Sequence, residues 1–169
     1  MTDHRSQLIQ HVPRLRRYAR ALTGERAAAD DLVQDTLERA LNKFHLWRHG
    51  SDLRAWLFTV MHNIYVNQVR ARAADRLDFS GEELRVPALQ ATAIERLEIR
   101  DIDSALRRLP EDQRAVVLLV GLEQLSYEEA ARALRIPVGT VMSRLARGRE
   151  RLRTMLSDTP PAAALKAVK

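Results

Sequence analysis

Residues 125–152, LSYEEAARALRIPVGTVMSRLARGRERL, carry the strongest structural signals in the chain. Ser126 stands three residues before Glu129, which is the spacing of a capping box at the start of a helix. The Arg-Ile-Pro segment at 135–137 predicts a turn, because proline disfavours helix in the residue before it. A longer helix is expected to follow over 138–156. A short capped helix, a three-residue turn and a longer basic helix predict a helix-turn-helix.

The last helix of this motif divides into two faces at 100° per residue. The apolar face is expected to pack on the preceding helices and contains Val141, Leu145, Gly148 and Leu152. The opposite face and its flanks carry Thr140, Ser143, Arg144, Arg147 and Arg151. Arginine can read guanine edges, and hydroxyl groups bind phosphate or bases. The alternative is a solvated basic helix end, since arginine is favoured at helix C-termini in any case.

Three helices are expected in the first part of the chain. The first has a stripe at Leu8, Val12, Leu15, Ala19 and Leu22, in which Pro13 predicts a kink or a late start. The second should run from Arg26 to Lys43 and bury Leu32, Val33, Thr36, Leu37, Ala40 and Leu41. After a loop at 44–50, Ser51 or Asp52 can cap the third. Its apolar stripe is Leu53, Trp56, Leu57, Val60, Ile64 and Val69.

Helical periodicity fades between residues 73 and 90 and restarts near Thr92. The net charge is +4 over residues 1–75, −1 over 76–100 and +3 over 101–169. A slightly acidic linker between two basic halves predicts an all-α protein of two small helical domains, 1–75 and 92–158, joined by a linker at 76–91. Residues 159–169 are expected to form a flexible tail.

Two helices are expected in the second domain before the helix-turn-helix. The first should bury Ile99, Ile102, Leu106 and Leu109. The second should start at Pro110-Glu111-Asp112 and reach about Leu122.

Composition narrows the class of partner. The chain has 169 residues, of which 46% are hydrophobic and 30% charged, with a net charge of +6 and a pI near 10.4. Of its 28 basic residues, 25 are arginine, which favours nucleic acid over a membrane surface as the partner. The absence of cysteine excludes disulfides and fits a reducing compartment. The longest apolar run, 115–120, is too short to span a bilayer.

Two groups of motifs resemble a known protein family. LPEDQR at 109–114, LSYEEAA at 125–131 and IPVGTV at 136–141 look like region 4 of the extracytoplasmic-function (ECF) sigma factors of bacterial RNA polymerase. DDLVQDT at 30–36 and LRAWLF at 53–58, continuing to Asn63, resemble region 2 of the same family. The matches occur in family order and cover almost everything from Leu8 to Leu156.

The resemblance implies a role for each set of residues. Region 4 reads the −35 promoter element, for which the candidates are Thr140, Ser143, Arg144, Arg147 and Arg151. Region 2 binds core polymerase, for which the candidates are Asp31, Gln34, Asp35 and Glu38. Region 2 also captures a flipped base of the −10 element, here with Asn63, Phe44, His62, Asn67 and Arg70. Met142 departs from the family, which commonly has arginine or lysine there, so the −35 sequence that is read can differ.

The resemblance therefore implies a sigma factor and not an enzyme. It implies no cofactor, and its implied partners are the β and β′ subunits of core polymerase, promoter DNA and an anti-sigma factor. The expected location is the cytoplasm, on the nucleoid when in holoenzyme. The alternative is a helix-turn-helix repressor or activator that acts without polymerase.

A hydrolase is disfavoured by the lack of a nucleophile elbow or P-loop in the sequence, and a peripheral membrane protein by the lack of large aromatic residues on the basic helix. His45 and His49 have the spacing of helical metal ligands but fall in a loop, so no metal site is expected. Tyr18 and Trp56 are expected in the core, and Trp47 either as a lid or as a stacking platform.

Overall fold

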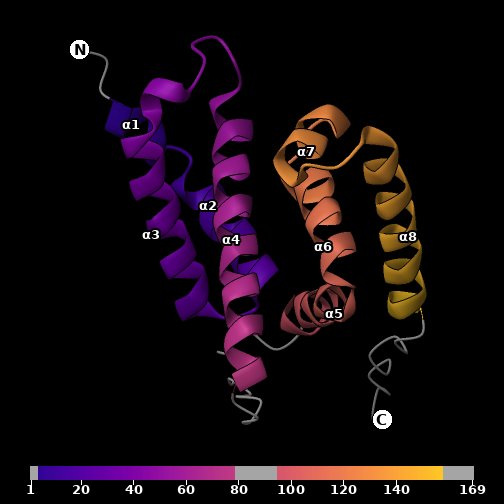
Figure 1. Ribbon diagram of the computed structural model, residues 1–169. Coiled ribbons are helices and arrows are strands. Elements are labelled where there is room, and N and C mark those ends of the chain that lie inside the picture. The colour runs from indigo at the N-terminus through magenta and orange to yellow at the C-terminus, as the bar shows by residue number, and fades with distance from the viewer. Residues whose placement is uncertain (1–3, 79–94, 158–169) are drawn as a thin grey trace, which may run out of the picture.

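The computed structural model describes residues 4–78 and 95–157, and these fold into helices joined by short turns (Figure 1). The two described stretches are called here the N-terminal module (4–78) and the C-terminal module (95–157). Most of the predicted linker and the predicted tail lie outside the described residues. None of the described helices is both long and apolar enough to cross a membrane.

The N-terminal module contains α1 (His4–Ile9), α2 (Val12–Thr23), α3 (Arg26–Asn42), the 3₁₀ turn η1 (Phe44–Leu46) and α4 (Leu53–Asp78). Pro13 lies in the first turn of α2, so the predicted late start is confirmed. Gly24 ends α2 in a left-handed conformation, φ 73°, that glycine adopts without strain. Asp52 caps α4 by accepting a hydrogen bond from the Arg54 amide at 2.8 Å. α4 continues to Asp78, beyond the point where apolar periodicity fades and into the predicted linker.

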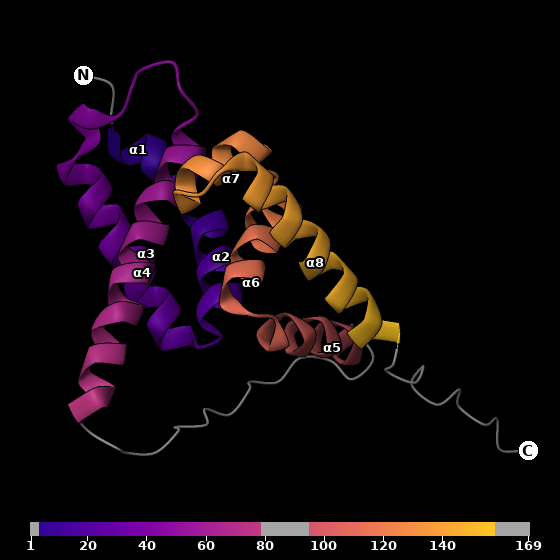
Figure 2. The same cartoon turned by 45° about the vertical axis from the view of Figure 1, so that its right-hand side comes forward.

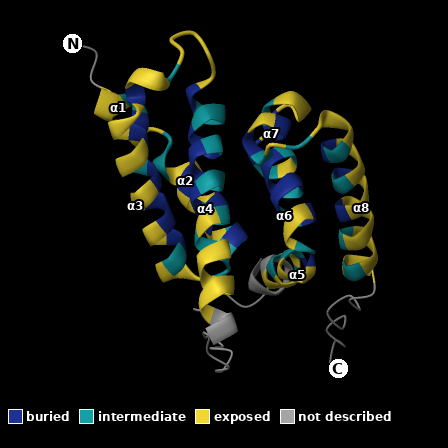
Figure 3. Ribbon diagram, in the orientation of Figure 1, coloured by how far each residue is buried: buried dark blue, intermediate teal, exposed yellow. Residues whose placement is uncertain are grey.

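The core of this module forms where α2, α3 and α4 face one another (Figure 3). Tyr18 is fully buried there, as predicted, and its ring meets Phe58 edge-on at 5.2 Å between centroids. Leu41 was predicted to be buried but is 41% exposed. It follows Ala40 by one residue, which turns its side chain about 100° away from the core.

The C-terminal module contains α5 (Glu95–Arg108), α6 (Glu111–Val117), the π-helical turn η2 (Leu118–Leu122), α7 (Tyr127–Leu134) and α8 (Val138–Ser157). The predicted capping box is confirmed: Ser126 Oγ accepts from the Glu129 amide at 3.1 Å, and Glu129 Oε2 accepts from the Ser126 amide at 2.8 Å. Ile102 is 48% exposed and not buried as predicted. Periodicity places it on the same face as the buried Leu109, seven residues later, but burial also requires a neighbouring helix to cover that part of the face.

The two modules pack against each other along α4 and α7, and α2 also touches η2 and α5 (Figures 1 and 2). The buried residues of both modules form one continuous cluster. Arg114 of α6 crosses the junction, since it donates to the carbonyl oxygens of Leu106 at 2.8 Å and Leu109 at 3.0 Å in its own module and to that of Leu22 at 3.3 Å in the other.

Gly148 allows α8 to lie close to α6. A Cβ atom there would stand 2.7 Å from Val117 Cγ2 and 3.5 Å from Gln113 Cβ. Gly148→Ala should lower the free energy of unfolding by about 1–2 kcal/mol net, because overpacking outweighs the gain in helix propensity. Gly139→Ala is the matched control, since nothing lies within 4 Å of its added Cβ. Urea unfolding that ranks the two variants equally would contradict this account.

Candidate nucleic-acid and polymerase surfaces

The outward face of α8 carries the polar residues that the sequence placed there. Ser143, Arg147 and Arg151 are exposed, and Thr140 is half-buried. Ser143 Oγ donates a hydrogen bond to the Thr140 carbonyl at 3.1 Å, so the hydroxyl lies close to the helix surface. Val141 and Leu145 are buried on the opposite side. The predicted division of this helix into a core face and a polar face is confirmed.

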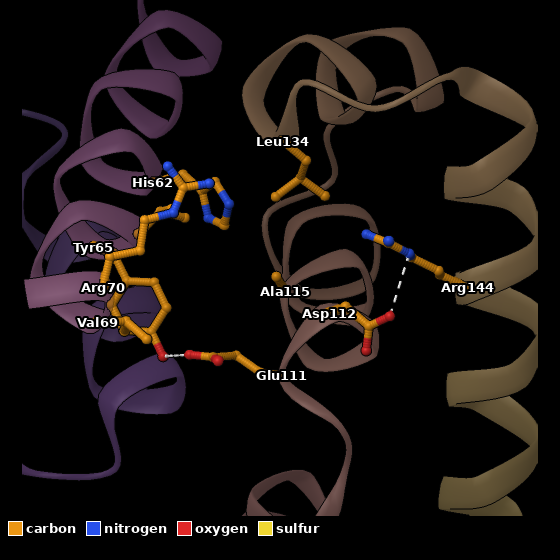
Figure 4. A pocket seen from close by; sticks show the side chains of 10 residues that line it. His62, Tyr65, Val69, Arg70, Glu111, Asp112, Ala115, Leu134 and Arg144 are labelled. Atoms are coloured by element: carbon orange, nitrogen blue, oxygen red, sulfur yellow. Dashed lines mark hydrogen bonds and ion pairs between the residues drawn. The ribbon is translucent and has the colours of Figure 1, made fainter. Parts of the chain in front are cut away.

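Arg144, the remaining residue predicted to contact the −35 element, does not point outward with the others. Its Nε lies 3.3 Å from Asp112 Oδ2 of α6, so the side chain points back towards the junction of the modules (Figure 4). About a third of the side chain is exposed. The sequence could not indicate this, because Asp112 is 32 residues away along the chain.

A groove of about 460 Å³ runs along α4 and gathers four of the five residues predicted for the −10 element. His62, Asn63, Asn67 and Arg70 line it, together with Arg39, Lys43, Leu46, Trp56, Thr59, Val60 and Val66. Leu134 and Arg135 of the helix-turn-helix form its other wall. Trp56 is partly buried: it packs against the core cluster, as predicted, and its remaining surface lines the groove.

Phe44, the fifth predicted residue, is buried behind this groove. Its ring packs against Trp47 at 5.3 Å and against Trp56 at 6.3 Å between centroids. It can thus support the groove wall without lining it. Arg39 and Lys43 also line the groove but were not among the predicted residues, because only the apolar and acidic faces of α3 had an expected role. The signal was a pair of basic residues four apart at the end of that helix.

A second cavity, of about 440 Å³, lies between α4 on one side and α6 and α8 on the other (Figure 4). Tyr65 of α4 donates a hydrogen bond to Glu111 of α6 across it. Burial, and the bond to Glu111, raise the pKa of Tyr65 well above its usual range. Burial lowers the pKa of His62 to about 4, so its imidazole is neutral at pH 7. His62 and Tyr65, which line the cavity from α4, are therefore both uncharged at pH 7.

The predicted polymerase-binding residues share one exposed face of α3. Asp31, Gln34, Asp35 and Glu38 follow one another at spacings of three and one, and all four are exposed. Asp35 Oδ2 accepts a hydrogen bond from Gln68 of α4 at 3.0 Å, and Gln34 donates to Glu38 at 3.4 Å. The face lies opposite the buried side of α3, so it is open to a partner while the fold is intact.

Glu123, at the end of η2, joins the modules through a fully buried carboxylate. Its Oε1 accepts from Arg17 Nε at 3.1 Å and from Arg17 Nη2 at 2.9 Å. Its backbone carbonyl accepts from Arg54 at 3.2 Å. The sequence does not indicate these contacts, because the partners of Glu123 lie 69 and 106 residues away along the chain. These contacts hold α7 over the groove that contains Asn63.

Comparisons with known proteins agree with this arrangement. The family model described as "Sigma2 domain of PhyR" matches residues 8–62, and that described as "Sigma-70, region 4" matches residues 99–152. The ECF RNA polymerase sigma factor EcfG of Rhodopseudomonas palustris is 39% identical over 157 residues, covering 92% of this chain and 87% of that protein. This chain belongs to the ECF sigma factors.

Other relatives support the assignment. SigL of Mycobacterium tuberculosis, also an ECF RNA polymerase sigma factor, is 35% identical over 161 residues, covering 88% of this chain and 86% of the relative. The sigma factor RpoE of Bartonella quintana, solved in complex with the anti-sigma factor NepR, superposes with a TM-score of 0.85 at 35% identity and covers 94% of this chain and 99% of its own. The predicted family and its two helical regions are confirmed.

Among the residues described in either module, no group of three or more acidic, histidine or cysteine side chains could hold a metal ion.

The packing of the two modules, called here the closed arrangement as opposed to an open one in which they are apart, should depend on the pair formed by Arg17 and Glu123. Arg17→Gln and Glu123→Gln should each shift the equilibrium towards the open arrangement by roughly 1–2 kcal/mol, which is about a five- to thirtyfold change in the ratio of open to closed molecules. The charge-assisted hydrogen bonds are lost, but the effect stays moderate because half of the Arg17 side chain is exposed to solvent. The natural sequence has no cysteine, so one introduced on α3 and one on α8 can carry fluorophores for energy transfer.

The control for this measurement is Arg16→Gln. Arg16 is the neighbour of Arg17 and pairs at 3.6 Å with Asp30, which belongs to the same module. It should leave the distance between the labels unchanged. Equal distances in all variants would show that the Glu123 contacts do not hold the modules together.

Proposed function

We propose that this sigma factor binds core RNA polymerase through the acidic face of α3 and reads two promoter elements with two different helices. The outer face of α8 contacts the duplex −35 element, and the groove along α4 captures an exposed base of the −10 element. The proposal is supported by the exposed arginines of α8 in the C-terminal module and by Asn63 of α4 in the N-terminal module, which lines the groove at the junction. Two separate sites suit two promoter elements on one DNA.

The chemistry of each surface fits its assigned ligand. Arg147 and Ser143 are the residue types that bind base edges and phosphates in a major groove. Asn63 and Asn67 offer amides that can pair with the edge of an unstacked base, and Trp56 offers a ring on which it can stack. Arg39, Lys43 and Arg70 surround the groove with positive charge that suits a sugar-phosphate backbone.

The closed arrangement implies that the two modules separate before the −10 element binds. The outer face of α8 is exposed while the modules are packed together, whereas the groove along α4 is walled by Leu134 and Arg135 of the C-terminal module. The modules must separate before a DNA strand enters the groove. A −10 DNA strand thus favours the open state by binding it better.

We further propose that an anti-sigma protein regulates this chain. The support is the relative RpoE, which was solved in complex with the anti-sigma factor NepR. The chain performs no reaction of its own and works in the cytoplasm, on the nucleoid when bound to polymerase. A repressor that acts without polymerase would bind duplex DNA equally well with and without the core enzyme.

Transcription from promoter libraries with core polymerase tests the proposal directly. Adding the chain to core enzyme should produce transcripts from a subset of templates, and mapping their start sites should reveal a shared pair of upstream elements. The proposal fails if the chain binds duplex DNA but neither joins core polymerase nor directs initiation.

Asp35→Arg should weaken binding to core polymerase by about tenfold or more, because it reverses a charge in the middle of the acidic face of α3. Asp75→Arg makes the same change of charge at an exposed position of α4 outside this face. Affinity for core polymerase and circular dichroism should be measured for both. An unaltered affinity in folded Asp35→Arg would remove α3 from the polymerase interface.

Arg147→Ala should cost about 1–3 kcal/mol in binding of the −35 element if the guanidinium reads a base. Arg108→Ala, at an exposed position on α5, is the matched control and should leave binding unchanged. Affinity of the polymerase complex should be compared between the mapped promoter and a scrambled −35 sequence. An equal loss on both DNAs would assign Arg147 to a phosphate.

A further inference from the structure

An apolar strip follows the outer side of α8 next to the polar residues. Val138, Met142 and Ala146 repeat every four residues, so they lie one above another on the helix. Val138 is 38% exposed and Met142 is 52% exposed. Ser143 and Arg147 each stand one residue further along the chain, about 100° around the helix, and they form a parallel polar strip.

The fold itself does not require the apolar strip. Val141 and Leu145 already fill the side of α8 that faces the module's core, where they are 0% and 2% exposed. Gly148 continues that buried side against Val117. Met142 is thus a large, flexible, apolar side chain that the packed chain leaves at the surface of a helix with five arginines and one acidic residue.

The surroundings of the strip indicate what covers it. Residues 135–153 contain six arginines and one acidic residue, so an anionic partner is favoured over an apolar protein helix. In a helix-turn-helix the first turns of the second helix enter the major groove. The apolar group displayed there is the C5 methyl of thymine. A duplex thus offers both the negative charge and the apolar contact that this surface combines.

We infer that Met142, with Ala146 beside it, contacts thymine methyl groups of the −35 element and is a determinant of its sequence. This inference rests on the proposed reading of that element by α8. Methionine suits the task because its unbranched side chain adapts to the position of a methyl group. Ala146 is small enough to let the helix approach the base edges. Ser143 and Arg147 then read polar groups on the adjacent positions.

Replacing thymine by uracil tests the contact, because it removes the methyl group and leaves base pairing intact. The probe is the promoter mapped with the polymerase complex, with each thymine of the −35 element replaced in turn. One or two replacements should weaken binding about fourfold, which corresponds to the ~0.8 kcal/mol gained by burying one such group. Met142→Ala should bind the thymine promoter about fourfold more weakly and should no longer respond to uracil at those positions.

Two further variants complete the design. Met142→Leu keeps an apolar side chain and should retain the response to uracil. Ile102→Ala is the matched control, because Ile102 of α5 is 48% exposed, close to the exposure of Met142, and lies off α8. It should leave both the affinity and the response to uracil unchanged.

The outcomes separate this inference from the function on which it rests. If the complex initiates transcription and Arg147→Ala weakens binding, but uracil has no effect at any position, the methyl contact is absent. The same conclusion follows if Met142→Ala responds to uracil as strongly as the natural chain. If no promoter is transcribed, or if Arg147→Ala and Met142→Ala are both without effect, the reading of the −35 element by α8 is wrong as well.

Discussion

The packing of the two modules depends on one buried carboxylate. Glu123 is removed from water, and a charge in that position destabilises the protein unless donors surround it. The donors come from the other module: Arg17 of α2 binds Oε1 of the carboxylate through two N–H groups, and Arg54 of α4 binds the carbonyl of the same residue. The second carboxylate oxygen, Oε2, is buried without a hydrogen-bond partner. The C-terminal module can therefore bury Glu123 only where α2 and the start of α4 are placed against it.

Because of this packing, the acidic face of α3, the outer face of α8 and the groove along α4 differ in how accessible they are. The acidic face of α3 and the outer face of α8 lie away from the junction and stay exposed in the packed state. The groove along α4 lies at the junction, where α7 forms one wall. In the proposed function, binding at the first two surfaces is compatible with the packed state, but a DNA strand in the groove would compete with Leu134 and Arg135. Only this last surface links binding directly to separation of the modules.

The sequence predicted those features that arise from residues near one another in the chain. The capping box at Ser126, the late start of α2 at Pro13 and the two faces of α8 each depend on a few neighbouring residues, and all three are confirmed. Leu41 and Ile102 were assigned to the core by periodicity alone, but burial depends on which helix lies opposite.

The same reason explains what was missed at the candidate sites. Asp112, which holds Arg144 against α6, and Arg17, which binds Glu123, lie far away in sequence from their partners. Helical periodicity carries no information on such pairs. The residues of the groove along α4 could be predicted only through the family resemblance, which placed Asn63, while the wall formed by Leu134 and Arg135 depends on how the modules pack.

The segment that carries Glu123 places its carboxylate at the junction of the modules. η2 is π-helical, with the Glu123 amide bonded to the Leu118 carbonyl at 3.0 Å, and Gln124 follows in a left-handed conformation at φ 57°. The desolvation of Glu123 offsets part of the gain from its hydrogen bonds. The carboxylate thus fixes where the modules meet, while the apolar cluster shared by both modules supplies the larger part of the packing energy.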